Sequence, residues 1–322
     1  MIHVRIVAPP DLAQPTLDLL AASPATIDLI HVPGGSIKPP GDFVLCDIVR
    51  EEASVVIDDL RELGLAERGS IAVEEVDTQL SELAAQAELA ARGSPADAVV
   101  WEEVEARTSQ GAELSVSFLA FMVVATLIAG MGILTDSQIL IIGAMVVGPE
   151  FGPIAGFCVA VVQRRLRLAR RSLVALAIGF PLAIVATFLV TLALRALGSA
   201  PETVAAVSRP ATYFIADPGA FSVIVATLAG VAGVLSLTTE RSGALTGVLI
   251  SVTTIPAAAN VGVAAAYGDW DEVGGALAQL GINLLCLMSS GIATLGLLRV
   301  VYQRRRRAAH ERGTAPSAPA SS

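Results

Sequence analysis

The sequence predicts an α-helical membrane protein with an N-terminal α+β domain, and three observations lead to this fold class. Hydrophobic residues make up 54% of the 322 residues and charged residues only 16%, with a mean hydropathy of +0.68. This composition is too apolar for an ordinary soluble enzyme. The charge is also unevenly divided, because residues 1–113 hold 21 acids and 7 bases whereas residues 114–322 hold 9 acids and 14 bases. Finally, the second part contains six apolar stretches, each long enough to cross a bilayer.

The first 77 residues alternate between strand and helix patterns. Strands are predicted at 3–8, 25–32, 43–49 and 70–77, helices at 11–23 and 50–65, and a Pro/Gly-rich loop at 33–42. The resulting order, βαββαβ, is that of the ferredoxin-like split unit. No signal peptide is visible, so we expect this domain to stay in the cytoplasm. Its acidity argues against nucleic acid as a partner, since no basic stripe is present to neutralise phosphates.

The rest of the chain divides into a connector, a membrane domain and a tail. Residues 78–113 read as a helical connector, in which Gly93 ends a first helix. The membrane domain, residues 114–303, holds apolar stretches at 114–134, 136–162, 172–197, 219–238, 243–267 and 273–301. Residues 304–322 begin with four arginines and become low-complexity, which predicts a basic and then disordered tail.

Charges between the apolar stretches predict the orientation of the chain in the membrane. Five arginines lie in 164–171 and four in 304–307, whereas Asp269, Asp271 and Glu272 lie between the fifth and sixth stretches. If both termini are cytoplasmic, both arginine clusters fall inside, as the positive-inside rule requires. We therefore expect a multi-pass protein of the cytoplasmic membrane.

The two halves of the membrane domain, 114–197 and 218–301, superpose when the chain is shifted by 104 residues. Thr135 then falls on Thr239, Asp136 on Glu240 and Gly143 on Gly247, and Pro256 falls on position 152, between Pro149 and Pro153. Each half has three spans, an odd number, so the second half must enter the membrane from the opposite side. The sequence thus predicts a 3+3 inverted repeat.

The candidate site lies in the Gly/Pro-interrupted segments of the two halves, 143–156 and 247–260. Inverted repeats with broken helices place substrate and ion sites near the bilayer midplane. The acid Glu150 lies at the first interruption, where it could carry a proton or help to coordinate a cation. The candidate pathway residues are Asp136, Ser137, Gly143, Gly148, Pro149, Glu150, Gly152, Pro153, Thr253, Thr254, Pro256 and Asn260.

Structural alternatives stand beside these roles. The prolines could only kink helices for packing, and Glu150 could form a structural ion pair or a hydrogen-bonded neutral acid. Asp136 and Glu240 could cap the helices that follow them or act in gating. Asn260 and Asn283 could line a cavity or join two helices, and the sequence does not separate these roles.

Enzymatic and metal chemistry are disfavoured. The three histidines, His3, His31 and His310, all lie outside the apolar stretches, and no Ser/His or His/Glu set appears within them. The three cysteines, Cys46, Cys158 and Cys286, have neither paired nor metal-ligand spacing. We therefore expect no catalytic residues, no metal and no cofactor.

A run of residues in the second stretch is similar to a known membrane family. The family pattern D-S-x-x-x-x-I-G-A-M followed by P-L-M-x-P-I is matched at Asp136, Ser137, Ile142, Gly143, Ala144, Met145, Pro149, Pro153 and Ile154. The chain resembles, over residues 101 to about 300, the bacterial and archaeal family known as domain of unknown function 389. Glu150 and Phe151 stand where that family usually has Leu and Met, so the resemblance implies no charge role for Glu150. It also implies no activity.

From the repeat we predict a transporter or channel for a small solute or ion in the lipid bilayer. The N-terminal domain would regulate or assemble it, within a homo-oligomer. The alternative is a membrane-embedded sensor whose N-terminal domain binds a cytoplasmic small molecule.

Overall fold

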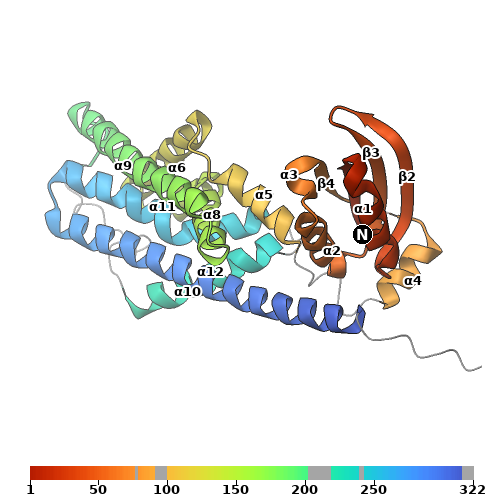
Figure 1. Cartoon of the computed structure of the whole chain (residues 1–322). Coiled ribbons are helices and arrows are strands. Elements are labelled where there is room, and N and C mark those ends of the chain that lie inside the picture. The colour runs from red at the N-terminus through yellow and green to blue at the C-terminus, as the bar shows by residue number, and fades with distance from the viewer. Residues whose placement is uncertain (77–78, 91–99, 202–218, 239–242, 314–322) are drawn as a thin grey trace, which may run out of the picture. The chain divides into compact units, whose positions relative to one another are not determined.

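The computed structural model divides the chain into two compact units, Met1–Val104 and Glu105–Ser322. It describes residues 1–76, 79–90, 100–201, 219–238 and 243–313, and Figure 1 shows the elements that they form. The side chains of α11 are described from Thr254 onward. Gly93, Glu240 and the tail beyond Gly313 lie outside the described residues.

The first unit contains a four-stranded antiparallel sheet with the strand order β2-β3-β1-β4. Its elements are β1 (Ile2–Ala8), α1 (Pro10–Ala22), β2 (Thr26–Ile37), β3 (Pro40–Ile48), α2 (Arg50–Glu62), α3 (Leu65–Arg68), β4 (Ser70–Glu75) and α4 (Glu82–Ala90). The βαββαβ order predicted from the sequence is confirmed, with the short α3 added after α2. Two interleaved β-α-β units produce this order.

One face of the sheet forms the core of the first unit. Residues of β1 alternate between buried and accessible, so that Ile2, Val4 and Ile6 point to one side. They pack in one cluster with Leu20 of α1 and Leu60 of α2. The alternation therefore directs both helices to the same face of the sheet.

The predicted loop at 33–42 is wrong, because β2 and β3 continue through it as a hairpin. Ser36 pairs with Gly41, and the register shifts between Val32 and Ser36, so that the Pro-Gly-Gly residues form an irregularity within the strand. The carboxylate of Asp42 accepts hydrogen bonds from the backbone N–H of Gly34 at 2.9 Å and from Nε2 of His31 at 2.7 Å. A side chain thus satisfies the backbone at the point where the ladder is interrupted.

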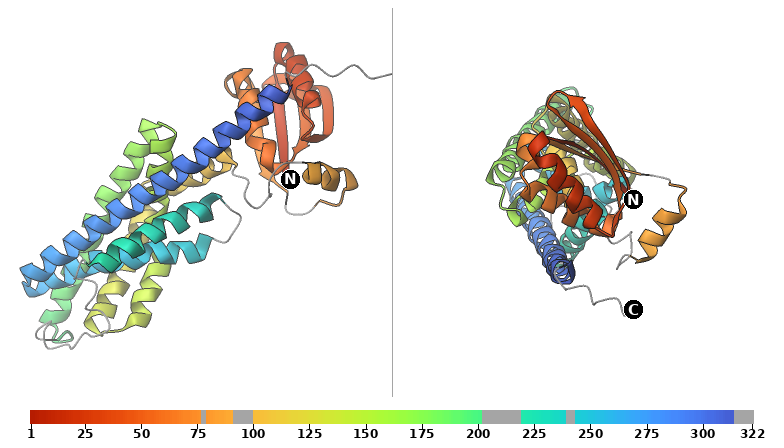
Figure 2. Two further views of the ribbon diagram at one scale, coloured as in Figure 1. Left: turned by 90° about the horizontal axis from the view of Figure 1, so that it is seen from below. Right: turned by 45° about the vertical axis from the view of Figure 1, so that its right-hand side comes forward.

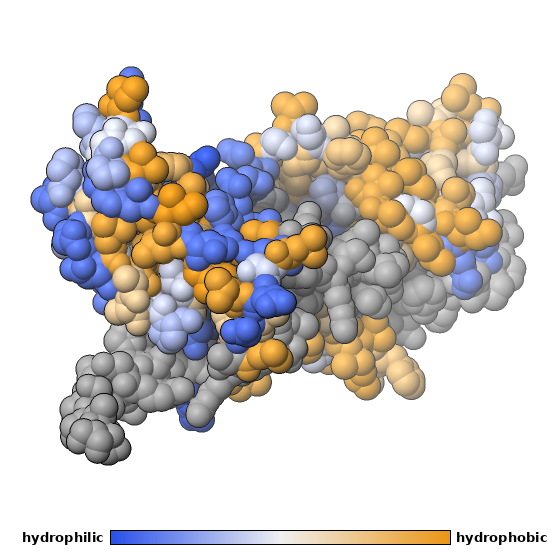
Figure 3. All heavy atoms as spheres, turned by 90° about the vertical axis from the view of Figure 1, so that its right-hand side faces the viewer, coloured by the Kyte–Doolittle hydropathy of each residue, from blue (hydrophilic) through white to orange (hydrophobic). Residues whose placement is uncertain are grey.

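The second unit is a bundle of helices that run along one another (Figure 2). Its helices are α6 (Val116–Leu134), α7 (Gln138–Val147), α8 (Phe151–Val162), α9 (Leu166–Ala196), α10 (Ala220–Thr238), α11 (Gly243–Tyr267) and α12 (Trp270–Gly313), preceded by α5 (Trp101–Gly111). Among the described residues, α6, α9, α10 and α12 are long and apolar enough to cross a membrane, and the bent pair α7 and α8 would make a fifth span. Large apolar side chains cover much of the outer surface, as the orange areas of Figure 3 show.

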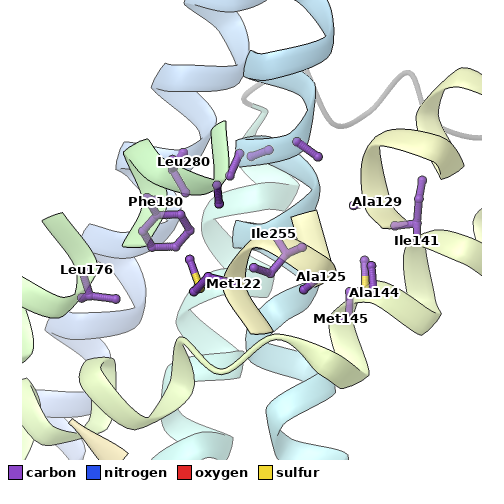
Figure 4. Packing of buried hydrophobic residues seen from close by; sticks show 14 of the residues in the cluster. Met122, Ala125, Ala129, Ile141, Ala144, Met145, Leu176, Phe180, Ile255 and Leu280 are labelled. Atoms are coloured by element: carbon purple, nitrogen blue, oxygen red, sulfur yellow. The ribbon is translucent and has the colours of Figure 1, made fainter. Parts of the chain in front are cut away.

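Small and flexible side chains allow these helices to pack closely. Met122 and Ala125 of α6 lie beside Ile255 of α11, and Phe180 of α9 belongs to the same cluster (Figure 4). All four residues are at most 5% exposed. Helices in membranes associate through such packing, because lipid tails leave little hydrophobic driving force.

Two features of the second unit recur at the offset of 104 residues, the helices α6 and α10 and one turn. Helices α6 and α10 both have 19 residues, and Val116 falls on Ala220. The turn between α8 and α9 has the same hydrogen bonds as the turn between α11 and α12. The N–H of Arg165 donates to the carbonyl of Ala160, as that of Asp269 donates to Ala264. The residues before them, Arg164 and Gly268, both have a positive φ, 58° and 75°, as in a Schellman motif.

The sequence prediction fails at the fifth stretch, where α11 is one continuous helix with Pro256 inside it. A single proline removes one backbone hydrogen bond, and membrane helices tolerate that loss. The second stretch differs because Gly148 and Pro149 adjoin each other. Only one of the two segments predicted to be broken is therefore broken.

Substitution of Asp42 by Ala should lower the melting temperature of the first unit at pH 7. Hydrogen bonds from Gly34 and His31 lower the pKa of the Asp42 carboxyl. A carboxyl whose pKa is lowered by folding stabilises the fold at any pH above its unfolded pKa of about 3.9. That stabilisation is lost as the pH falls through the folded pKa. The difference from the unaltered protein should hold from pH 8 to pH 5 and shrink below pH 4.

Melting can be followed by the fluorescence of Trp101, which is buried in the first unit, in a Trp270→Phe background. Asp18→Ala, which removes a carboxylate from α1, serves as the control. An Asp42→Ala difference that grows at low pH would contradict the assignment.

Candidate functional site

The break between α7 and α8 is the centre of the candidate site. Helix α7 ends at Val147 with Gly148 as its C-cap, and α8 begins at Phe151, so Pro149 and Glu150 lie between them. The two helices bend by 51° at this point. Pro153 lies in the first turn of α8, where its missing N–H removes no helical hydrogen bond. The interruption predicted from the Gly and Pro residues is confirmed in this half.

Glu150 is completely buried at the break. Its exposed fraction is 0%, and its Oε1 accepts a hydrogen bond from Oγ1 of Thr254 at 2.9 Å. Thr254 is also 0% exposed and lies in α11, one turn before Ala258. The two residues are 104 positions apart, so the contact joins the positions that the sequence shift superposes. A buried acid in an apolar bundle normally has such a polar partner.

The other candidate residues lie at several places. The side chain of Asn260, in α11, donates through Nδ2 to Oε1 of Glu272 in α12 at 3.0 Å. Pro256 is buried within α11. The side chain of Thr253 lies outside the described residues. Gly143 is exposed on α7 with no atom within 4 Å of a built β-carbon, so the structure does not bring it to Glu150.

Asp136 and Ser137 stand at the opposite end of α7 from Glu150. Helix α7 has 10 residues, which separate them from the break by about 15 Å at 1.5 Å per residue. The predicted cap at Asp136 is wrong, because Ser137 is the N-cap and accepts from the N–H of Leu140. Asp136 instead forms the preceding turn with a φ of 48°, a conformation that Asp adopts more readily than most residues.

Gly152 allows α8 to approach α5 closely. A β-carbon at this position would lie 2.3 Å from the carbonyl oxygen of Gly111. The glycine is therefore needed for helix contact, beside the break.

Sequence reasoning missed two arginines that bond to helix ends. Arg195 of α9 donates to the carbonyl of Ala266 in α11, and Arg299 of α12 donates to the carbonyl of Val162 in α8. The guanidinium carbon of Arg195 also lies 4.4 Å from the ring centre of Tyr267. The shift of 104 residues pairs Arg195 with Arg299, so the repeat itself was the signal that could have found them.

These observations define the class of protein: an α-helical membrane protein with an N-terminal sheet and helix unit and a bent pair of apolar helices. Residues 145–289 match the family described as "Domain of unknown function (DUF389)", which confirms the resemblance predicted from the sequence. The matched range includes the break, Glu150 and Thr254.

A relative of the chain comes from an archaeon. The chain is 25% identical to an uncharacterised protein of Methanocaldococcus jannaschii over 194 residues, and this matched region is 60% of the chain. The match spans 58% of the length of that relative. No solved structure matches the chain.

Substitution of Gly152 by Ala should destabilise the second unit. The added methyl group meets the Gly111 backbone, which cannot rotate away, and overpacking of this kind costs about 1–3 kcal/mol. Gly143→Ala is the matched control, because open space surrounds that position and the change favours the helix by about 0.5–1 kcal/mol. Thermal unfolding of both variants in detergent measures the difference. Equal melting temperatures would contradict the close contact.

Proposed function

We propose that this chain is a membrane transporter or channel for a small solute or ion, built as a 3+3 inverted repeat around Glu150 and Thr254. Six spans are proposed, with the bent pair α7 and α8 as the second and α11 as the fifth. At 25 residues, α11 is longer than the roughly 20 residues that cross a bilayer. The hydrogen bond between Glu150 and Thr254 is the observation that carries the proposal.

Two residues related by a two-fold axis can touch each other only if both lie close to that axis. Glu150 and Thr254 are equivalent under the shift of 104 residues and are joined at 2.9 Å. In an inverted repeat the axis lies in the membrane plane, so their contact supports a position near the bilayer midplane. An acid there is costly, by at least about 2.5 kcal/mol on insertion scales, and typically marks an ion or substrate pathway.

The two arginine contacts support the same axis. Arg195 of the first half donates to Ala266 of the second, and Arg299 of the second half donates to Val162 of the first. Both the donors and the acceptors are 104 residues apart, so the contacts are reciprocal. Each binds the carbonyl end of a second span in the opposite half, where a cation is favoured.

Packing near the middle of the bundle is reciprocal as well. β-Carbons built at Gly130 and Gly262 would both lie 2.9 Å from Thr187, so a threonine packs between two glycines. At the equivalent positions, a β-carbon built at Gly291 would lie 3.0 Å from Sγ of Cys158 and 3.4 Å from Cγ2 of Val234. In one set of positions a larger residue lies between two glycines, and in the equivalent set a glycine lies between two larger residues. This exchange supports a common packing arrangement in the two halves.

Broken helices and facing halves support transport by relative motion. The end of α7 and the start of α8 direct opposite partial charges toward the break, beside the Glu150 carboxyl. Movement of one half against the other about the Glu150–Thr254 contact would expose this site to each side in turn. We also propose that both termini are cytoplasmic, from the arginines in 164–171 and 304–307.

The first unit is proposed to regulate or assemble the membrane part, in a homo-oligomer. On the sheet face opposite the core, Asp47 accepts hydrogen bonds from His3 at 2.6 Å and from Gln79 at 2.8 Å. These two donors satisfy the Asp47 carboxylate, which favours a scaffold over the alternative of a metabolite sensor.

The test is flux through the full chain in proteoliposomes. Currents on a solid-supported membrane would be recorded after concentration jumps of sodium and potassium chloride, amino acids and small organic acids. For any substrate that gives a current, Glu150→Gln should reduce it at least about tenfold, the effect of losing about 1.4 kcal/mol from the transported complex. Thr254→Val should reduce it less, because it removes one hydrogen bond.

Thr126→Val is the matched control. Thr126 is also 0% exposed, but its hydroxyl donates within its own helix, to the carbonyl of Met122. Unchanged flux in Glu150→Gln and Thr254→Val would contradict the site. A loss in Thr126→Val as large as in Thr254→Val would contradict the special role of the contact between halves.

A further inference from the structure

A column of carboxylate and amide side chains runs through the second half of the membrane part. Helix α12 carries Glu272, Gln279 and Asn283 at spacings of seven and four residues. At 100° per residue these three positions span about 40° around the helix axis, so they lie on one face. Gln279 is 6% exposed and Asn283 is 0% exposed. Asn260 of α11 joins them through its hydrogen bond to Glu272. We name these four residues the polar column.

The polar column extends from the α11–α12 turn to the depth of Glu150. Helices α11 and α12 are joined by a turn at Gly268 and Asp269, and they pack against each other. Thr254 lies 14 residues before Gly268, and Asn283 lies 14 residues after Asp269, so both are about 21 Å from the turn at 1.5 Å per residue. Thr254 bonds to Glu150. The polar column therefore ends at the depth of the acid.

The equivalent positions in the first half hold no carboxylate or amide side chain. Subtracting 104 gives Leu168, Gly156, Ala175 and Gly179 in place of Glu272, Asn260, Gln279 and Asn283. A β-carbon built at Gly156 would lie 2.9 Å from both the β-carbon of Ala112 and Oγ of Ser172. One built at Gly179 would lie 2.9 Å from the ring of Phe118. Close packing therefore fills these positions in the first half, whereas polar side chains occupy them in the second half.

Two atoms in the polar column indicate the ligand. Oδ1 of Asn260 and Oε1 of Gln279 are buried and have no hydrogen-bond partner among the described residues. Asn260 is oriented by Glu272, because its amide nitrogen donates to that carboxylate. The unused groups are acceptors, whose burial without a donor or cation costs free energy. An anion would be repelled by them and by Glu272.

We infer that the polar column is the path and binding site of a small inorganic cation, which enters from the α11–α12 turn and reaches Glu150. Carboxylate and amide oxygens are the ligands that hard cations prefer. The cation moves along the oxygens of Glu272, Asn260, Gln279 and Asn283 and meets the Glu150 carboxyl beside Thr254. This inference rests on the proposed transport function, for which it names the substrate class and the side that is open.

The first test is the reactivity of a cysteine in the polar column. Gln279→Cys and its repeat equivalent Ala175→Cys are made in a full-length background in which Cys46, Cys158 and Cys286 are alanine. Both positions are buried at 6% exposure or less. Aminoethyl methanethiosulfonate, a small cationic reagent, should modify Gln279→Cys at least about ten times faster. Equal rates would overturn the path.

The second test uses the protein with its native residues in the polar column. Its melting temperature is measured in sodium, potassium or magnesium chloride and in choline chloride of equal ionic strength. At least one metal cation should raise the melting temperature relative to choline, and Gln279→Leu and Glu150→Gln should each abolish that rise. No rise with any of the three cations, or a rise that persists in both variants, would overturn the cation site.

These outcomes separate the inference from the proposed function. Cation-dependent stabilisation without any current in proteoliposomes would leave the cation site standing and remove transport. Currents carried by an amino acid or organic acid, insensitive to Gln279→Leu and without cation stabilisation, would retain transport and overturn the cation path.

Discussion

The hydrogen bond between Glu150 and Thr254 is the interaction on which the rest of the membrane part depends. A carboxyl group that is 0% exposed in an apolar bundle must be satisfied by protein, because lipid offers no donor. The donor comes from α11, a helix of the other half. The break that exposes the backbone at Pro149 and the contact that joins the halves are therefore located at the same place.

Symmetry and its violation have different uses in this chain. Arg195 and Arg299 are reciprocal, and they stabilise the same arrangement of helices in both halves. Polar residues break that symmetry at two pairs of equivalent positions. The acid Glu150 is equivalent to the neutral Thr254, and the amide Asn260 is equivalent to Gly156. Under the proposed transport function, shared packing would give two related states of comparable energy, and the polar differences would give the proposed pathway its charge and direction.

Local features of the fold were predictable from the sequence, and long-range ones were not. Adjacent Gly148 and Pro149 identify the break, because proline and glycine act on their own backbone. The break predicted at Pro256 is wrong, because a single proline followed by the helix-forming Ala257 and Ala258 does not interrupt the helix. The shift of 104 residues aligned Glu150 with Thr254, but their contact depends on how distant helices pack, which no local pattern encodes. The same holds for the arginine contacts to Val162 and Ala266.

The orientation of the two equivalent turns tests the inverted repeat most directly. Leu166 and Trp270 are 104 residues apart, begin α9 and α12, and are 83% and 72% exposed. Leu166→Cys and Trp270→Cys, in a background without the native cysteines, would be labelled with a membrane-impermeant maleimide in intact and in permeabilised cells. The inverted repeat predicts that Trp270→Cys is labelled in intact cells and Leu166→Cys only after permeabilisation. Labelling of both from the same side would contradict the inverted repeat and, with it, the midplane position of Glu150.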